Sequence, residues 1–283
     1  MKMETSRRNF LGAAAGAAGL SAFSVRTASA VIEAEPWGMK LGVATYSLRS
    51  FDRTTAIAML KKLQVKYISI KDVHLKLTES PEELRQHRKE FDDAGFVVTS
   101  GGNVDMTKGT TVEDLRPRFE YAKNAGLPMM VCAPTHENIK SVEALVKEYN
   151  IRIAIHNHGP EDKHFPTPQS VLEVVRKLDK RCGLCMDIGH STRAGADIVK
   201  SAAEAGDRLF DMHVKDLADK TSRESQVDIG DGVLPFPALF KQLKKMGYTG
   251  CINMEYEINA KDPMVGMLRS LSYERGVLAG LAG

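Results

Sequence analysis

Short apolar runs alternate along this chain with segments whose apolar residues recur at helical spacing, beginning near Met39. Interpreted as buried strands, the short runs cover residues 40–46, 67–71, 96–100, 127–132, 151–156, 183–188, 209–214 and 250–255. The segments with helical spacing cover 54–63, 81–94, 112–124, 137–149, 168–178, 197–205, 235–246 and 263–279. The pattern therefore predicts eight strand–helix units in strict alternation.

Strict alternation with short connections favours parallel strands joined by right-handed crossovers, and eight such units close into a barrel. A doubly wound open sheet is the competing architecture. Its dinucleotide-binding versions carry a G-x-G-x-x-G turn after the first strand, and residues 40–46 are not followed by one. We therefore predict an α/β protein with a single (β/α)8 TIM barrel domain over residues 31–283.

Residues 1–30 are expected to form a targeting segment outside that domain. Residues 6–11 (SRRNFL) resemble the twin-arginine export motif, and an Ala/Gly-rich run over 11–25 precedes an A-x-A cleavage site at 28–30. The run is too short and too rich in glycine to span a membrane. We expect a periplasmic or secreted protein without stable membrane insertion after the signal is cleaved.

The amino-acid composition narrows the classes of function that are expected for the chain. The chain has 283 residues, is 43% hydrophobic and carries a net charge of only +3, so no basic surface for nucleic acid is expected. Its four cysteines include a Cys182-x-x-Cys185 pair, which raises a redox alternative. Positions three apart on a strand face opposite sides, so buried free thiols are favoured.

Polar residues that interrupt the ends of apolar runs are the candidate functional groups. Asp187 and His213 end two consecutive predicted strands, and a divalent cation shared between them would neutralise both. The alternative is an Asp that caps the next helix and a His satisfied in the core. Other polar residues at predicted strand ends are Lys71, His74, His156, His158, His190, Lys215 and Glu255, whereas strands 96–100 and 127–132 are expected to contribute little.

Three motifs in order, D-x-G-H at 187–190, H-V-K-D at 213–216 and E-Y-E at 255–257, resemble the xylose-isomerase-like barrel family of sugar (phosphate) isomerases and epimerases. The Gly-x-Gly-x-x-Pro-Phe stretch over 230–236 also matches the loop before the family's seventh helix. The resemblance implies one divalent metal ion with ligands His156, Asp187, His213 and Glu255. It also implies substrate contacts from His190 and Lys215, to which His74 from the second strand is added.

The chain departs from the family at the fifth strand, where His156-Asn157-His158 replaces the usual E-N-H. His156 is the favoured ligand, but His158 lies on the same strand face and stays open as the alternative. With one carboxylate fewer, the ligands balance a divalent charge, and the added imidazole favours Mn, Co, Zn or Fe over Mg. Glu255 is then the remaining carboxylate base, with Lys71 or His158 as a second acid or base, unless Lys71 only extends to solvent.

These residues lead to three hypotheses for a small-molecule carbohydrate partner. The first is a divalent-metal-dependent isomerase or epimerase that moves a proton next to the metal-bound carbonyl of a small keto-sugar. The second is a metal-dependent lyase or hydratase on 3-keto-sugars or keto-glycosides, and the third is an exported sugar-binding barrel without turnover. The sequence leaves the sugar, the metal and the oligomeric state open.

The export hypothesis predicts the behaviour of a double substitution. Because the twin-arginine receptor recognises the paired guanidinium groups, Arg7→Lys with Arg8→Lys should leave the precursor inside the cell, as measured by fractionation and immunoblotting. Unchanged secretion would assign the segment to the general export pathway instead.

Overall fold

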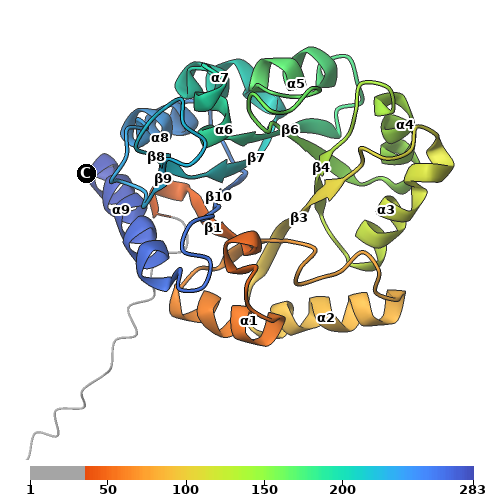
Figure 1. The fold of residues 1–283 in the computed structure, drawn as a ribbon, viewed down its shortest axis with the longest axis horizontal. Coiled ribbons are helices and arrows are strands. Elements are labelled where there is room, and N and C mark those ends of the chain that lie inside the picture. Colours follow the sequence, from red (N-terminus) through yellow and green to blue (C-terminus); the bar gives the residue numbers. More distant parts are fainter. Residues whose placement is uncertain (1–35) are drawn as a thin grey trace, which may run out of the picture. The chain divides into compact units, whose positions relative to one another are not determined.

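Eight parallel strands form a closed barrel in the computed structural model, which describes residues 36–283 (Figure 1). The order around the barrel is β1-β10-β7-β6-β5-β4-β3-β2. The strands are β1 (Lys40–Ala44), β2 (Tyr67–Ile70), β3 (Val97–Asp105), β4 (Met129–Ala133), β5 (Arg152–His156), β6 (Cys182–Asp187), β7 (Leu209–Val214) and β10 (Cys251–Met254). The predicted TIM barrel is confirmed. The predicted targeting segment lies outside the described residues, so export stays a prediction.

Helices surround the barrel on its outer side (Figure 1). They are α1 (Arg53–Lys62), α2 (Pro81–Asp93), α3 (Val112–Asn124), α4 (Ile139–Tyr149), α5 (Pro168–Val175), α6 (Ile188–Arg193), α7 (Ile198–Ala205), α8 (Phe236–Lys245) and α9 (Met264–Ala282). Among these described helices, none is long and apolar enough to cross a membrane. Local signals explain where several of them begin: Ser80 and Glu83 form a capping box ahead of α2, with Pro81 at its first position.

Short elements that the sequence pattern did not predict lie mostly between the main strands and helices. They are the 3-10 turns η1 (Pro36–Gly38), η2 (Thr45–Leu48) and η3 (Gly206–Arg208), and the hairpin strands β8 (Asp216–Leu217) and β9 (Gln226–Val227). Helix α6 was also missed, because it starts immediately after β6 and spans only six residues. The remaining elements agree with the predicted ranges apart from shifts at their ends.

Strand β3 corrects the expectation that the third strand would end at residue 100, before Gly101 and Gly102. It continues to Asp105 and pairs with β4 beyond the glycines. Gly102 has a φ of 127°, and a Cβ there would collide with the carbonyl oxygen of Val131. The glycine therefore permits β3 and β4 to approach each other closely. Because β3 continues beyond it, Asn103 lies at the end of the barrel that holds the predicted site.

Alternation along the strands separates the barrel interior from the layer beneath the helices. On β6, Cys182, Leu184 and Met186 belong to the large core between barrel and helices. Cys185 belongs to a second cluster with Met129, Val131, Ala154 and Phe210, two residues before Asp187 and on the same strand face. All four cysteines are free and buried, as predicted, and Cys182 and Cys185 face opposite sides of the sheet.

The last residue of the H-V-K-D motif organises the connection between β7 and α8. The buried Asp216 carboxylate accepts hydrogen bonds from the backbone N–H groups of Gly230, Gly232 and Leu234, at 3.0–3.2 Å, and from that of Leu217. A Cβ on Gly232 would collide with this carboxylate. The glycines of the 230–236 motif therefore allow backbone N–H groups to approach Asp216 closely.

This loop anchor makes a prediction about stability. Asp216→Asn removes the negative charge and turns an amide N–H₂ toward backbone donors, so it should lower the free energy of unfolding by about 1.5–3 kcal/mol. Urea unfolding measures the loss. The control is Asp231→Asn in the same loop, where the carboxylate pairs with Arg269 at the surface, and it should change stability by less than about 0.5 kcal/mol. Equal losses for both variants would contradict the anchoring role.

Candidate metal centre

Four buried side chains meet at the C-terminal end of the barrel: His156 from β5, Asp187 from β6, His213 from β7 and Glu255 immediately after β10. Each offers one donor atom, and these atoms all lie within 4.8 Å of one another. The barrel register produces the group, because Asp187 and His213 are direct partners on adjacent strands. The polar residues at the ends of four predicted apolar runs therefore converge.

The spacing of the donor atoms fits a divalent ion. His156 Nε2 lies 3.0 Å from His213 Nδ1 and 3.6 Å from Asp187 Oδ2, and His213 Nδ1 lies 3.3 Å from Glu255 Oε1. Ligand atoms about 2.0–2.2 Å from a tetrahedral ion are about 3.3–3.6 Å apart.

An unpartnered buried atom supports the same interpretation. Asp187 Oδ2, one of the converging donor atoms, is buried and has no hydrogen-bond partner. Unpartnered polar atoms in a protein interior cost free energy, and a bound cation would remove that cost for this oxygen. The residues present fit the predicted metal.

Lys215 supplies positive charge next to this group. Its Nζ lies 2.9 Å from Glu255 Oε2 and 3.1 Å from Asp187 Oδ2, and it also donates to Glu257 Oε2. Burial opposes the charge of the ammonium, but the three carboxylates outweigh that effect and raise the pKa of Lys215 well above its usual value. Because the charges of Lys215 and Glu257 cancel, the predicted balance between the four ligands and a divalent ion is unchanged.

The same contacts keep the two carboxylates ionised. Burial opposes the ionisation of Asp187, but His190 and Lys215 hold its pKa well below the usual range. Burial likewise opposes the ionisation of Glu255, and Lys215 and His213 hold its pKa well below the usual range. Both carboxylates are therefore available as anionic ligands at neutral pH.

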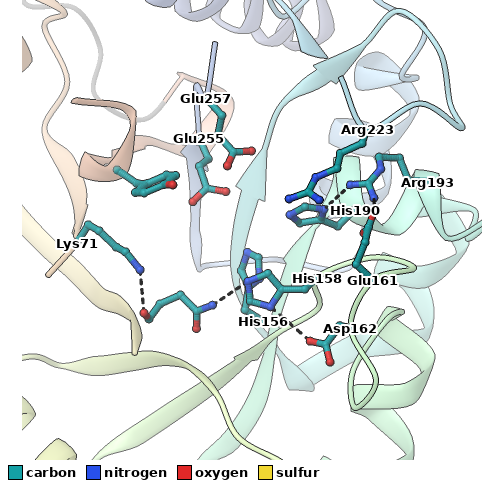
Figure 2. A pocket seen from close by; sticks show the side chains of 12 residues that line it. Lys71, His156, His158, Glu161, Asp162, His190, Arg193, Arg223, Glu255 and Glu257 are labelled. Carbon is teal, nitrogen blue, oxygen red and sulfur yellow. Dashed lines mark hydrogen bonds and ion pairs between the residues drawn. The ribbon is translucent and has the colours of Figure 1, made fainter. Parts of the chain in front are cut away.

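A pocket of about 470 Å³ opens beside the metal group (Figure 2). This is the size of site that takes small-molecule ligands. It is lined mainly by polar and charged side chains: Tyr46, Lys71, Asn103, His156, His158, Glu161, Asp162, His190, Arg193, Arg223, Glu255 and Glu257. His156 and Glu255 therefore belong both to the metal group and to the pocket wall.

Three other residues predicted from the sequence also line this pocket: Lys71, His158 and His190. His158 lies beside His156, with 4.3 Å between ring centroids, but outside the group of four. Its Nε2 is 3.0 Å from Asn103 Nδ2 and its Nδ1 is 3.5 Å from Asp162 Oδ2. Lys71 Nζ donates to the backbone oxygen of Asn103 at 2.9 Å.

His190 reaches the pocket from α6. Its Nε2 lies 3.9 Å from Asp187 Oδ2, and Arg193 Nη1 lies 3.3 Å from its Nδ1. The ring is therefore held between an acidic ligand candidate and an arginine.

Two predicted substrate contacts are not brought to the pocket wall. His74 is buried, and its ring nitrogens lie 3.0 Å from Thr45 Oγ1 and 3.2 Å from the backbone oxygen of Phe51. It connects η2 and the segment after it to the chain beyond β2. Lys215 is also absent from the pocket wall, because its ammonium is enclosed by carboxylates.

Sequence reasoning missed several residues of the pocket. The expectation that strands three and four contribute little is corrected by Asn103 on β3. Local spacing offered a signal for two others, because Asp162 follows His158 by four residues and Arg193 follows His190 by three. Arg223 comes from the loop between β8 and β9 and had no local signal.

Comparisons with known proteins agree with this architecture. The model of the family described as xylose isomerase-like TIM barrel matches residues 57–272. The chain belongs to this family. The uncharacterized protein MJ1311 of Methanocaldococcus jannaschii is 30% identical over 122 residues, which are 41% of this chain and 41% of that protein. This chain therefore spans about two-fifths of the relative's length.

Two solved members of the same fold extend the comparison. D-psicose 3-epimerase, crystallised in the presence of D-fructose, superposes with a TM-score of 0.68 at 16% identity over 86% of this chain and 100% of that chain. The IOLI protein with a bound zinc atom gives a TM-score of 0.70 at 18% identity, over 86% and 99%. At such identities the likeness shows the xylose isomerase-like fold alone.

The four-residue group predicts metal retention. The purified protein should hold about one divalent ion per chain, and Asp187→Ala should weaken binding by at least the roughly 10–100-fold that the loss of an outer-shell partner costs. Elemental analysis after dialysis measures the metal. His158→Ala is the matched control and should keep the ion, because His158 is adjacent to the group without belonging to it. Full retention in a chain carrying both Asp187→Ala and Glu255→Ala would exclude this centre.

Proposed function

We propose that the chain is a divalent-metal-dependent isomerase or epimerase that moves a proton next to the carbonyl of a small keto-sugar. The observation that carries the proposal is the double position of Glu255, which is both a member of the metal group and part of the pocket wall. A carboxylate in that position touches the ion and the substrate together. When bound, the divalent ion supplies Lewis-acid polarisation of a carbonyl.

Glu255 is the proposed base. Lys215 donates to its Oε2 and keeps the group ionised, while the contact of Oε1 with His213 fixes the carboxylate from the other side. A base held in this way faces the pocket in one orientation, which favours proton removal from a carbon held next to it.

His158 is the proposed second acid or base. Its Nδ1 faces Asp162 (Figure 2), and its Nε2 lies 3.0 Å from Asn103 Nδ2, so Asn103 Nδ2 donates to Nε2 when Nδ1 carries the proton toward Asp162. Burial opposes the ionisation of Asp162, but His158 and the backbone N–H groups of His164 and Phe165 lower the pKa of Asp162 to about 2. A permanently ionised partner therefore orients the ring, and a proton delivered by His158 would complete an epimerisation begun by Glu255.

Lys71 provides the other route to a second acid. Its ammonium donates to the backbone oxygen of Asn103 and lies 5.6 Å from the ring centroid of Tyr46 at the pocket wall. A lysine in this position serves as a proton donor or as an electrostatic contact for a substrate oxygen. Substitution of His158 and Lys71 one at a time separates the two routes.

A lyase or hydratase acting on 3-keto-sugars or keto-glycosides is the second candidate. It is favoured by the single carboxylate of the metal group at the pocket wall: Asp187 is fully buried, and His156 stands where the family usually has glutamate. One carboxylate base suits an elimination, in which a proton leaves one carbon and a β-leaving group departs from the next, or the reverse addition of water.

We also propose that the mature chain acts in the periplasm or outside the cell. Twin-arginine export carries folded proteins, so the metal would be inserted before translocation. An exported enzyme meets few sugar phosphates, because these are largely cytoplasmic, and the proposed substrate is therefore an unphosphorylated sugar or sugar derivative.

One experiment distinguishes these activities. The metal-loaded protein is incubated in D₂O with a panel of keto-sugars and keto-glycosides, and the products are followed by NMR. Deuterium uptake with formation of an isomer supports the isomerase or epimerase, and a new enone supports the lyase. Binding without any exchange at a substrate carbon would instead support a sugar-binding barrel without turnover.

The role of Glu255 predicts the kinetics of a conservative variant. Glu255→Gln keeps the shape and one oxygen donor but loses the base, so kcat should fall by about 10²–10⁴-fold at metal concentrations that restore occupancy. Glu257→Gln is the matched control, because it also contacts Lys215 and lines the pocket without belonging to the metal group. It should lose less than about tenfold. If Glu255→Gln keeps more than about a tenth of wild-type kcat, the base is Lys71 or His158.

A further inference from the structure

Cys185 places a thiol directly beneath the metal group. It precedes Asp187 by two residues on β6, so both side chains point into the barrel, with Cys185 about 6.6 Å further along the strand from the pocket. The thiol is fully buried among the apolar side chains of the barrel interior. No substrate role explains it, because it does not line the pocket.

The thiol shares its surroundings with both histidines of the centre. One donor atom each from His156, Cys185 and His213 lie within 4.8 Å of one another. Both rings are at least nine-tenths buried, and each has a nitrogen without a hydrogen-bond partner, His156 Nδ1 and His213 Nε2. Two buried imidazoles next to a thiol, each with one unpartnered nitrogen, form a donor set of the kind that borderline and soft metal ions prefer.

Lys215 makes this deeper set compatible with the rest of the centre. Its ammonium already contacts Asp187 and Glu255, which an ion in the upper position must share with it. An ion held by His156, Cys185 and His213 needs neither carboxylate, so Lys215 keeps both of them.

We propose that Cys185, His156 and His213 form a second, deeper metal position that takes soft or borderline divalent ions such as Zn²⁺, Co²⁺ and Cd²⁺. The two positions share the histidines and are occupied alternatively. Binding in the deeper one forms a metal–sulfur bond and releases the thiol proton to solvent. Hard ions such as Mn²⁺ and Mg²⁺ remain with Asp187 and Glu255, because carboxylates suit them better than a thiolate.

This inference rests on the metal centre of the proposed function and adds a consequence to it. An ion in the deeper position lies further from the pocket and leaves Glu255 free of metal. The choice of ion therefore selects between a position beside the substrate and one withdrawn from it, and an ion in the deeper position inhibits because it keeps the two histidines from an ion in the upper one.

Cobalt spectroscopy on the full-length chain tests the proposal without depending on activity. The Co²⁺-loaded protein should show a thiolate-to-cobalt charge-transfer band in the near ultraviolet, and Cys185→Ser should abolish it. Cys182→Ser is the matched control on the same strand and should keep the band, because Cys182 faces the helices. The preference for Cd²⁺ over Mn²⁺, measured by competition, should fall by at least about tenfold in Cys185→Ser.

X-ray absorption of the Zn²⁺-loaded wild-type chain needs no variant and decides the matter even where Cys185→Ser does not fold. A sulfur ligand at about 2.3 Å supports the deeper position. Bound metal without a sulfur ligand, a band that survives Cys185→Ser, or one that Cys182→Ser also removes, overturns the inference and leaves the proposed function intact. Failure of the wild-type chain to bind any of these ions, Mn²⁺ included, overturns both.

Discussion

Burial of negative charge is the constraint around which this site is built. Asp187 and Glu255 are buried at the C-terminal end of the barrel, where an isolated carboxylate would be strongly destabilised. The ammonium of Lys215 offsets that cost in the metal-free chain. The aliphatic part of the Lys215 side chain passes close to Gly189, where an added Cβ would lie 2.6 Å from Lys215 Cγ. The glycine of the D-x-G-H motif is therefore required by the lysine that directly follows the next strand.

His156, at the position where the resemblance to the family implies a glutamate, also fits this constraint. Burial, followed by the neighbouring His158, holds the pKa of His156 well below its usual value, so the ring is neutral at physiological pH. A neutral imidazole is a metal ligand as it stands and adds no third carboxylate to the buried group. The substitution therefore lowers the negative charge that Lys215 and a metal ion must balance, and it leaves Glu255 as the carboxylate of the centre that faces the pocket.

The sequence was sufficient to place a candidate residue wherever a polar side chain interrupts a single strand. Asp187 and His213 each break an apolar run, and the eight alternating units fixed the end of the barrel at which they meet. The direction in which a side chain points beyond the end of a strand was not predictable in this way. His74 follows β2 by several residues and turns into the core, because Thr45 and Phe51 offer it partners there. Arg223 reaches the pocket from a loop, and nothing in local spacing indicates where a loop side chain points.

The hydrogen bonds of Asp216 have a consequence for how this barrel varies. They tie the start of the β7–α8 connection to its end, so the intervening residues 218–229 leave the barrel and return at nearly the same point. Insertions and substitutions within that excursion change the rim of the pocket, where Arg223 lies, while β7 and α8 keep their positions. The lining of the pocket can thus diverge in one exchangeable segment, while the end of the barrel that holds the four-residue group is preserved.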